Sequence, residues 1–175
     1  MSSSGVFVSD SQNGAVYRLA RGGYSLTALV APGVGKSAQG SAMDVAAKRL
    51  IVADYAQGVS AIDLATGSRT ILTRADGRPV HGIDGMLRCG SNYYAIYNGA
   101  PPGWLIRFTI DGDRIAFDKL IEGAPLVDPT QVAYDGKRLL IVADSGWAAV
   151  DKQDVPRASG TPIVAVPLSS NCQPL

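Results

Sequence analysis

His81 and Asp84 are the two side chains best suited to acid–base or metal chemistry. They lie three positions apart, and His81 is the only histidine of the chain. An imidazole can act as a general base or a metal ligand, and a carboxylate suits a hard cation such as Ca²⁺ or Mg²⁺. The commoner alternatives are structural: Asp84 then binds backbone amides of its own turn, and His81 lies exposed in a loop.

Four further polar residues recur at a nearly constant interval. Asp10, Asp54, Asn98 and Asp144 each end a short apolar run, and they are 44, 44 and 46 residues apart. Aspartate and asparagine favour turns, so the recurrence indicates a structural role in closing the turn after each run. Asn98 and Asp144 are kept as candidates for the rim of a central channel.

The elements that position these residues follow the same period. Each unit of about 44 residues contains four short β-rich runs separated by turn signals such as Thr66-Gly67 and Asp111-Gly112, and none shows a helical period over ten residues. Four antiparallel strands per unit of ~40–50 residues is typical of a propeller blade. A blade packs between two neighbours and buries both of its faces. The propeller fold therefore also explains runs such as Leu139–Ala143, which are apolar without alternation.

We therefore predict an all-β protein: a β-propeller of about four blades with four antiparallel strands each. The blades are expected at residues 6–31, 39–75, 81–122 and 128–168 of a single domain, 1–175. The first lacks its innermost strand. In the last, either 147–151 is the third strand, or 147–161 is a loop and 162–168 is the third strand, which Pro156, Ser159 and Gly160 favour.

Function in a propeller usually resides at the mouth of the central channel, where the innermost strands begin. The equivalent positions in successive units are Gln39, Asp84 and Thr130. Trp104 and Trp147 follow the third and fourth anchors, and core packing is the favoured role for both, with a pocket wall as the alternative.

Three longer segments of the sequence resemble a known protein family. The segments GSAMDVAAKRLIVAD, GIDGMLRCGSNYYAIYNGAPPGW and DPTQVAYDGKRLLIVADSGW are similar to NHL-like and SMP-30/gluconolactonase/LRE-like propellers. The resemblance implies about six blades and, in some members, a divalent-metal-dependent lactonase or esterase. It implies that Asp84, in its Asp-Gly-hydrophobic turn, matches a metal ligand. The glutamate and asparagine that complete such a site have no counterpart at Gln39 or Thr130.

Composition and short motifs exclude several other classes of protein. With 16 basic and 15 acidic residues the net charge is +1, which argues against nucleic-acid binding. No apolar run approaches the ~20 residues of a membrane span, and the first residues carry no export signal, so we expect a soluble chain of unknown compartment. Cys89 and Cys172 are expected to be free thiols, a disulfide being the alternative. Gly33 to Ser37 resembles the end of a P-loop, but Val30 stands where that motif needs glycine.

Two functions follow as predictions. The first is a binding or assembly module of unknown specific activity, because too few blades leave apolar faces and strand edges that predict a homo-oligomer or a second propeller fragment as partner. The alternative is a metal-dependent lactonase or esterase, with Asp84 as ligand, His81 and Asp84 as the acid–base pair, and the site completed by another chain. A small-molecule ligand at the channel mouth is compatible with both.

Overall fold

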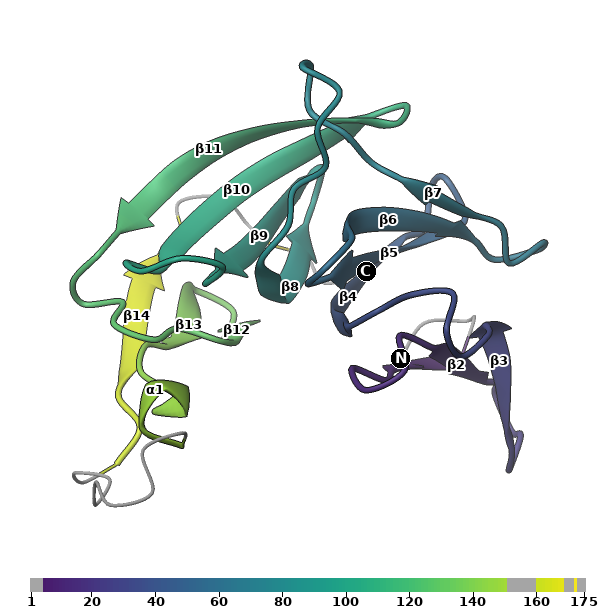
Figure 1. Ribbon diagram of the computed structural model, residues 1–175, viewed down its shortest axis with the longest axis horizontal. Coiled ribbons are helices and arrows are strands. Elements are labelled where there is room, and N and C mark those ends of the chain that lie inside the picture. Colours follow the sequence, from purple (N-terminus) through teal and green to yellow (C-terminus); the bar gives the residue numbers. More distant parts are fainter. Residues whose placement is uncertain (1–4, 151–159, 169–171, 173–175) are drawn as a thin grey trace.

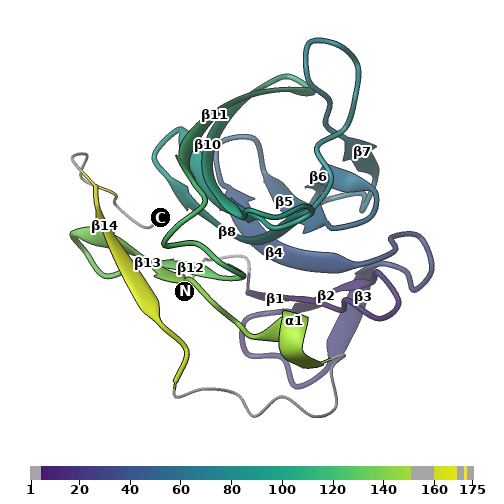
Figure 2. The same ribbon diagram turned by 60° about the vertical axis from the view of Figure 1, so that its left-hand side comes forward.

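A computed structural model describes residues 5–150, 160–168 and 172. These residues form four antiparallel sheets arranged around a common centre as an open arch (Figures 1 and 2). The only helix among them is the single turn α1 (Trp147–Val150). The predicted all-β propeller of about four blades is confirmed, with incomplete first and last blades.

We number the sheets as blades 1 to 4 in chain order. Blades 2 and 3 have four strands each, and blades 1 and 4 have three. Blade 1 contains β1 (Val6–Ser9), β2 (Val16–Leu19) and β3 (Leu26–Val30). Blade 2 contains β4 (Ala38–Asp44), β5 (Arg49–Asp54), β6 (Gly58–Asp63) and β7 (Arg69–Ile71). Blade 3 contains β8 (Ile83–Cys89), β9 (Asn92–Tyr97), β10 (Trp104–Asp111) and β11 (Arg114–Glu122). Blade 4 contains β12 (Val132–Tyr134), β13 (Arg138–Val142) and β14 (Ile163–Pro167).

The blades pack face to face through three apolar clusters. Along β5, Leu50 and Val52 pack towards blade 1, whereas Ile51 and Ala53 pack towards blade 3. The side chains of a strand alternate between its two faces, so a strand between two neighbours must be apolar on both. The same holds for β9, where Tyr93 joins the cluster with blade 2 and Tyr94 the cluster with blade 4. This double burial is the reason for the unbroken apolar runs in the sequence.

The two end blades differ from the prediction in detail. Strand β14 pairs with β13, which confirms 162–168 as the third strand of blade 4. The predicted loop at 147–161 begins instead with the helical turn α1, and residues 151–159 lie outside the described part of the chain. In blade 1, β1 is an edge strand paired only with β2, as expected for a blade without its innermost strand.

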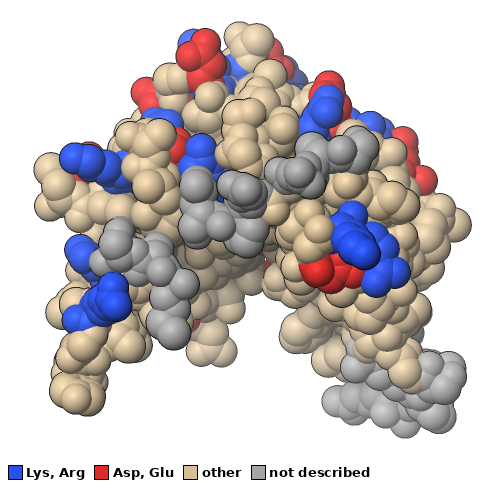
Figure 3. Space-filling view, turned by 180° about the vertical axis from the view of Figure 1, so that it is seen from behind, with Lys and Arg blue, Asp and Glu red and all other residues tan. Residues whose placement is uncertain are grey.

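Over the residues that the structure describes, the arch does not close on itself. Strand β1 contacts β4, β4 contacts β8, and β8 contacts β12. Among the described residues, no contact of similar extent joins blade 1 to blade 4. Figure 3 shows the two ends as separate legs with a hollow between them. No helix in the described ranges has the length and apolar character needed to cross a membrane.

Candidate functional site

The starts of the innermost strands, near Gln39, Asp84 and Thr130, approach one another closely. Strands β4 and β8 carry the same irregularity: their registers shift between Ala38 and Ser41 and between Ile83 and Met86. The intervening residues are Gln39-Gly40 and Asp84-Gly85. A Cβ on Gly40 would lie 2.6 Å from the Asp84 carbonyl oxygen, and one on Gly85 would lie 2.6 Å from the Thr130 carbonyl oxygen. Glycine at these bulges therefore permits three strands to meet near the axis.

Asp84 lies in a polar cluster at this end of the blades. Its Oδ2 accepts a hydrogen bond from Asn98 Nδ2 at 3.2 Å, and the same nitrogen donates to the Pro129 carbonyl at 2.9 Å. Burial raises the pKa of Asp84, and the negative charge of Asp128 raises it further, against the opposing hydrogen bond from Asn98. The structure thus brings together Asp84 and Asn98, two candidates from different runs of the sequence.

Tyr55 and Asp128 extend the cluster and were not predicted. The Tyr55 hydroxyl donates to the Asn98 carbonyl at 3.3 Å, and its pKa is raised by burial and by the charges of Asp84 and Asp128. Asp128 accepts hydrogen bonds from the Ser145 hydroxyl and the Trp147 backbone N–H, both at 2.7 Å. Tyr55 directly follows the anchor Asp54, which was the one signal in the sequence that could have located it.

The recurrent aspartates make turns, as their spacing predicted. Asp10 accepts the backbone N–H of Gln12, and Asp144 accepts that of Gly146. Asp54 accepts those of Ala56 and Gln57, and it also forms an ion pair with Arg69 at 3.3 Å. Asp144 is therefore a turn residue. Asp54 also accepts the backbone N–H groups of Lys36 and Ser37, in the connection between blades 1 and 2, and Asn98 bonds the Pro129 carbonyl, in the connection between blades 3 and 4.

Gln39 and Thr130 contribute mainly structure. The Gln39 amide donates to the Ser37 hydroxyl, and Thr130 is buried with its N–H bonded to the Val142 carbonyl. Gln39 also borders a hollow of about 370 Å³ at the inner ends of the blades, whose lining includes Ser9, Ser11, Met86 and Gln131. This hollow is polar and carries no charged side chain, so it offers hydrogen bonds but no acid–base group.

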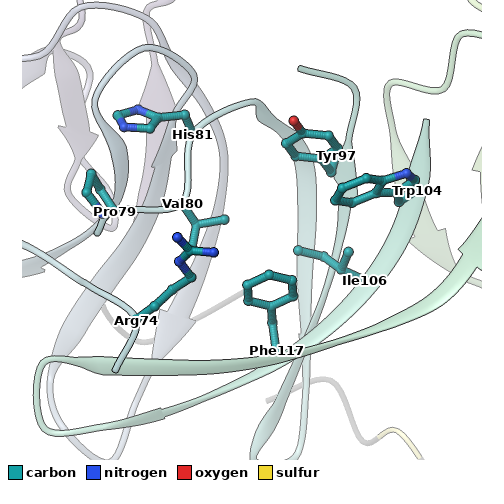
Figure 4. Close-up of a pocket in the computed structure, with 8 residues that line it drawn as sticks. All are labelled: Arg74, Pro79, Val80, His81, Tyr97, Trp104, Ile106 and Phe117. Atoms are coloured by element: carbon teal, nitrogen blue, oxygen red, sulfur yellow. The ribbon is translucent and has the colours of Figure 1, made fainter. Parts of the chain in front are cut away.

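His81 does not face Asp84. Its Nδ1 lies 2.9 Å from the Ala56 carbonyl, and no hydrogen bond joins it to Asp84 within the described residues. Its side chain borders a separate cleft of about 290 Å³ between blades 2 and 3, opposite Tyr97 and Trp104 (Figure 4). The geometry gives no support to the predicted acid–base pair, because the two side chains have different neighbours.

The residues around Asp84 do not fit a divalent cation. Hard cations require several oxygen ligands, usually including more than one carboxylate. The described residues contain no group of three or more His, Cys, Asp or Glu side chains that could hold a metal ion. Asn98 turns its nitrogen, not its oxygen, towards the Asp84 carboxylate. We therefore derive no chemistry through a metal at this place.

Two further expectations are corrected. Cys89 and Cys172 were expected to be free, but they form a disulfide that attaches the C-terminal segment to β8. Their separation of 83 residues in the sequence did not indicate this pairing, because the folding of the blades brings distant residues together.

Trp147 was expected to pack in the core but is 65% exposed, whereas Trp104 packs against the cluster between blades 2 and 3.

The outward faces of the two end blades are apolar. In blade 1, the face opposite to the cluster with blade 2 consists of residues paired across the strands: Val6, Val8, Tyr17, Leu19, Leu26 and Ala28. In blade 4, the face opposite to blade 3 presents Ala133, Leu140, Val142, Ile163 and Ala165, with Arg138 and Pro167 at one end. Val6, Leu26 and Ile163 are about half exposed, at 47%, 52% and 56%.

Comparisons with known proteins show the fold and nothing finer. No family model matches the chain, and no curated protein matches it. Among solved structures, a chain of the nidogen/laminin complex is 13% identical with a TM-score of 0.62, and the match covers 81% of this chain and 57% of that one.

The PQQ-bound aldose sugar dehydrogenase from Streptomyces coelicolor is 16% identical with a TM-score of 0.56, covering 87% of this chain and 51% of that one. The computationally designed Ika4 protein is 8% identical with a TM-score of 0.56, and the match covers 97% of this chain and 88% of that one. The chain thus spans little more than half of the two natural proteins. Both are β-propellers, and at this identity the likeness shows a shared fold without identifying the SMP-30/gluconolactonase/LRE-like family.

Proposed function

We propose that this chain is an assembly module that completes a propeller ring by packing blade 4 against blade 1 of a second copy. The observation that carries the proposal is the pair of apolar faces at the two ends of the arch. Each is built like the faces that are buried inside the chain, and exposed apolar faces of this kind mark interaction sites.

The apolar end faces themselves indicate that the partner is a second copy of this chain. Where two blades follow each other in the chain, the apolar face of one is covered by the apolar face of the next, as between blades 2 and 3. A contact from the end of one copy to the beginning of another is head-to-tail, and it forms a ring when the rotation closes. Propellers have about four to eight blades, so two copies of four blades reach a closed ring and three exceed it. A dimer is therefore the expected assembly.

The test is the molar mass in solution, measured by size-exclusion chromatography with light scattering. The unaltered chain should elute as a dimer. Leu26→Glu places a charge on the free face of blade 1, and Ile163→Lys places one on the free face of blade 4. Each variant alone should be monomeric, because burying an unpaired charge costs several kcal/mol.

Mixing the two variants distinguishes a head-to-tail contact from a symmetric one. In the mixed dimer one contact is unaltered and the other juxtaposes the glutamate with the lysine, so dimers should re-form. Val45→Glu is the matched control, because Val45 is 47% exposed in a turn of blade 2 away from both faces. A monomeric unaltered chain, or a dimer that Leu26→Glu leaves intact, would overturn the proposal.

Metal-dependent hydrolysis of lactones or esters remains a prediction from the family resemblance, with Asp84 as its ligand. The set of ligands around Asp84 is incomplete among the described residues, and in this proposal a partner supplies the rest. Its assay is hydrolysis of gluconolactone with Ca²⁺ or Mg²⁺ added. Turnover that Asp84→Asn abolishes would support it, and absence of turnover in the dimer would remove it.

A further inference from the structure

We propose that the cleft between blades 2 and 3 binds a small aromatic carboxylate, with its ring on the apolar wall and its carboxylate on Arg74. This inference is independent of the assembly of the chain, because the cleft lies between the two middle blades and contains none of the end-face residues. It rests on the composition of the walls, the unused donor capacity of Arg74 and the size of the space.

The two walls of the cleft differ in chemistry. Residues 74–81, between β7 and β8, supply Arg74 and His81 on one side. Strands β9, β10 and β11 supply Tyr97, Ile106 and Phe117 on the other, and Figure 4 shows Arg74 and Phe117 extending into the same space. An apolar surface facing a few polar groups is the usual make-up of a small-molecule site.

Trp104 forms part of the wall and does not stack on a ligand. Its ring is stacked on Tyr97, with centroids 4.3 Å apart, and the Lys119 ammonium lies 3.9 Å from the ring centroid. These neighbours occupy the indole ring and hold the aromatic wall in place. Apolar contact with a ligand therefore falls to Phe117, Ile106 and Tyr97.

Arg74 has donors to spare. Among the described residues its side chain bonds only the exposed Asp76, at 2.8 Å, and exposed pairs of this kind contribute little. A guanidinium has five N–H donors, and Nη1 of Arg74 forms no hydrogen bond among the described residues, whereas Nε is buried and is not reached from the cleft. A carboxylate is the acceptor whose geometry matches a guanidinium best.

The segment that carries Arg74 is fixed to the opposite wall. Arg114 Nη1, on β11, donates to the Thr73 hydroxyl at 2.9 Å and to the Arg74 carbonyl at 3.0 Å. A backbone bridge also joins Thr73 to Arg114. Because the site is pre-formed, binding need not order a loop. The volume of about 290 Å³ is at the lower end of small-molecule sites and suits one ring with a short acidic chain.

The test is an NMR titration of the ¹⁵N-labelled protein with phenylacetate, phenylacetamide and acetate. Phenylacetate should bind saturably and shift the Trp104 indole N–H signal. Phenylacetamide keeps the ring without the charge, and acetate keeps the charge without the ring. Each should bind at least about tenfold more weakly, since a charged hydrogen bond and a buried ring each contribute a factor of this order.

Arg74→Gln should weaken phenylacetate binding at least about tenfold. Arg107→Gln is the matched control, because Arg107 forms a comparable surface pair with Asp118 on blade 3 but does not border the cleft, and binding should be unchanged. Equal affinity for phenylacetamide, undiminished binding to Arg74→Gln, or no saturable binding of phenylacetate would each overturn the proposal. The comparison of the three compounds uses the unaltered protein and does not depend on the folding of a variant.

Discussion

Asn98 illustrates how one side chain changes from a local turn to a contact between blades. Asp54 accepts N–H groups from the second and third residues after it. The third residue after Asn98 is Pro101, which has no N–H to give. The Asn98 amide binds Asp84 and the Pro129 carbonyl instead. Asp10 and Asp144 bond only the second residue after them, so the difference lies in the amide itself: unlike a carboxylate, Asn98 carries an NH₂ group that can donate to a carboxylate and to a carbonyl.

Asp84 makes the stability of the protein depend on pH in a defined direction. Burial raises its pKa above the ordinary 3.8, so the folded protein holds this proton more tightly than the unfolded chain does. The unfolded state releases the proton first as the pH rises, and the contribution of Asp84 to stability is lost as the pH rises through the folded pKa. The Asp84→Asn side chain cannot ionise. As the pH rises from about 3.8 to neutrality, the free energy of unfolding of this variant should therefore increase relative to that of the wild type.

Urea unfolding at a series of pH values measures this difference. Asp113→Asn removes a carboxylate from the exposed turn between β10 and β11 and serves as the control for the loss of charge alone. A difference between Asp84→Asn and the wild type that stays constant with pH would show that Asp84 is not held in a desolvating environment.

The sequence singled out Asp84 and Asn98 but not Tyr55 and Asp128. The position of Asp84 followed from the repeat, because Gln39, Asp84 and Thr130 occupy equivalent places at the starts of successive units. Tyr55 and Asp128 reach it from other blades, and such contacts depend on the rotation between sheets, which no local pattern encodes. The predicted pairing of His81 with Asp84 rested on nearness in sequence, whereas the His81 ring nitrogen contacts the Ala56 carbonyl of another segment.

At the scale of elements, Gly85 sets the approach of β8 to β12. A Cβ there would lie 2.6 Å from the Thr130 carbonyl oxygen and 2.7 Å from Gln131 Cα, both backbone atoms that cannot rotate away. Gly85→Ala should therefore lower the free energy of unfolding by about 3 kcal/mol, measured by urea denaturation. Gly23→Ala is the control, because its nearest contact would be the Ala20 carbonyl oxygen at 3.1 Å, and its cost should stay below about 1 kcal/mol. Equal losses in the two variants would contradict this account of the inner strands.

The strands themselves were predictable from their patterns, and the ends of the arch were less so. Runs such as residues 50–53 are apolar on both faces, which is the mark of a strand between two sheets. The helical turn α1 was missed because four residues are too few to show a helical period. Strand β14 could be assigned only by weighing the loop-forming residues before it, since its own pattern also suits other positions in a blade.

At the scale of the whole molecule, the disulfide between Cys89 and Cys172 connects the C-terminal segment to the inner strand of blade 3 across 83 residues. A cross-link closing a loop of this length reduces the entropy of the unfolded chain, with a stabilisation of up to about 4.5 kcal/mol in the loop-entropy model. Adding dithiothreitol should lower the urea midpoint of the unaltered protein by a corresponding amount. Cys172→Ser should already have the lower midpoint and should not respond to the reductant. Equal midpoints with and without reductant, at a complete thiol titre, would show that the segment is held by packing alone.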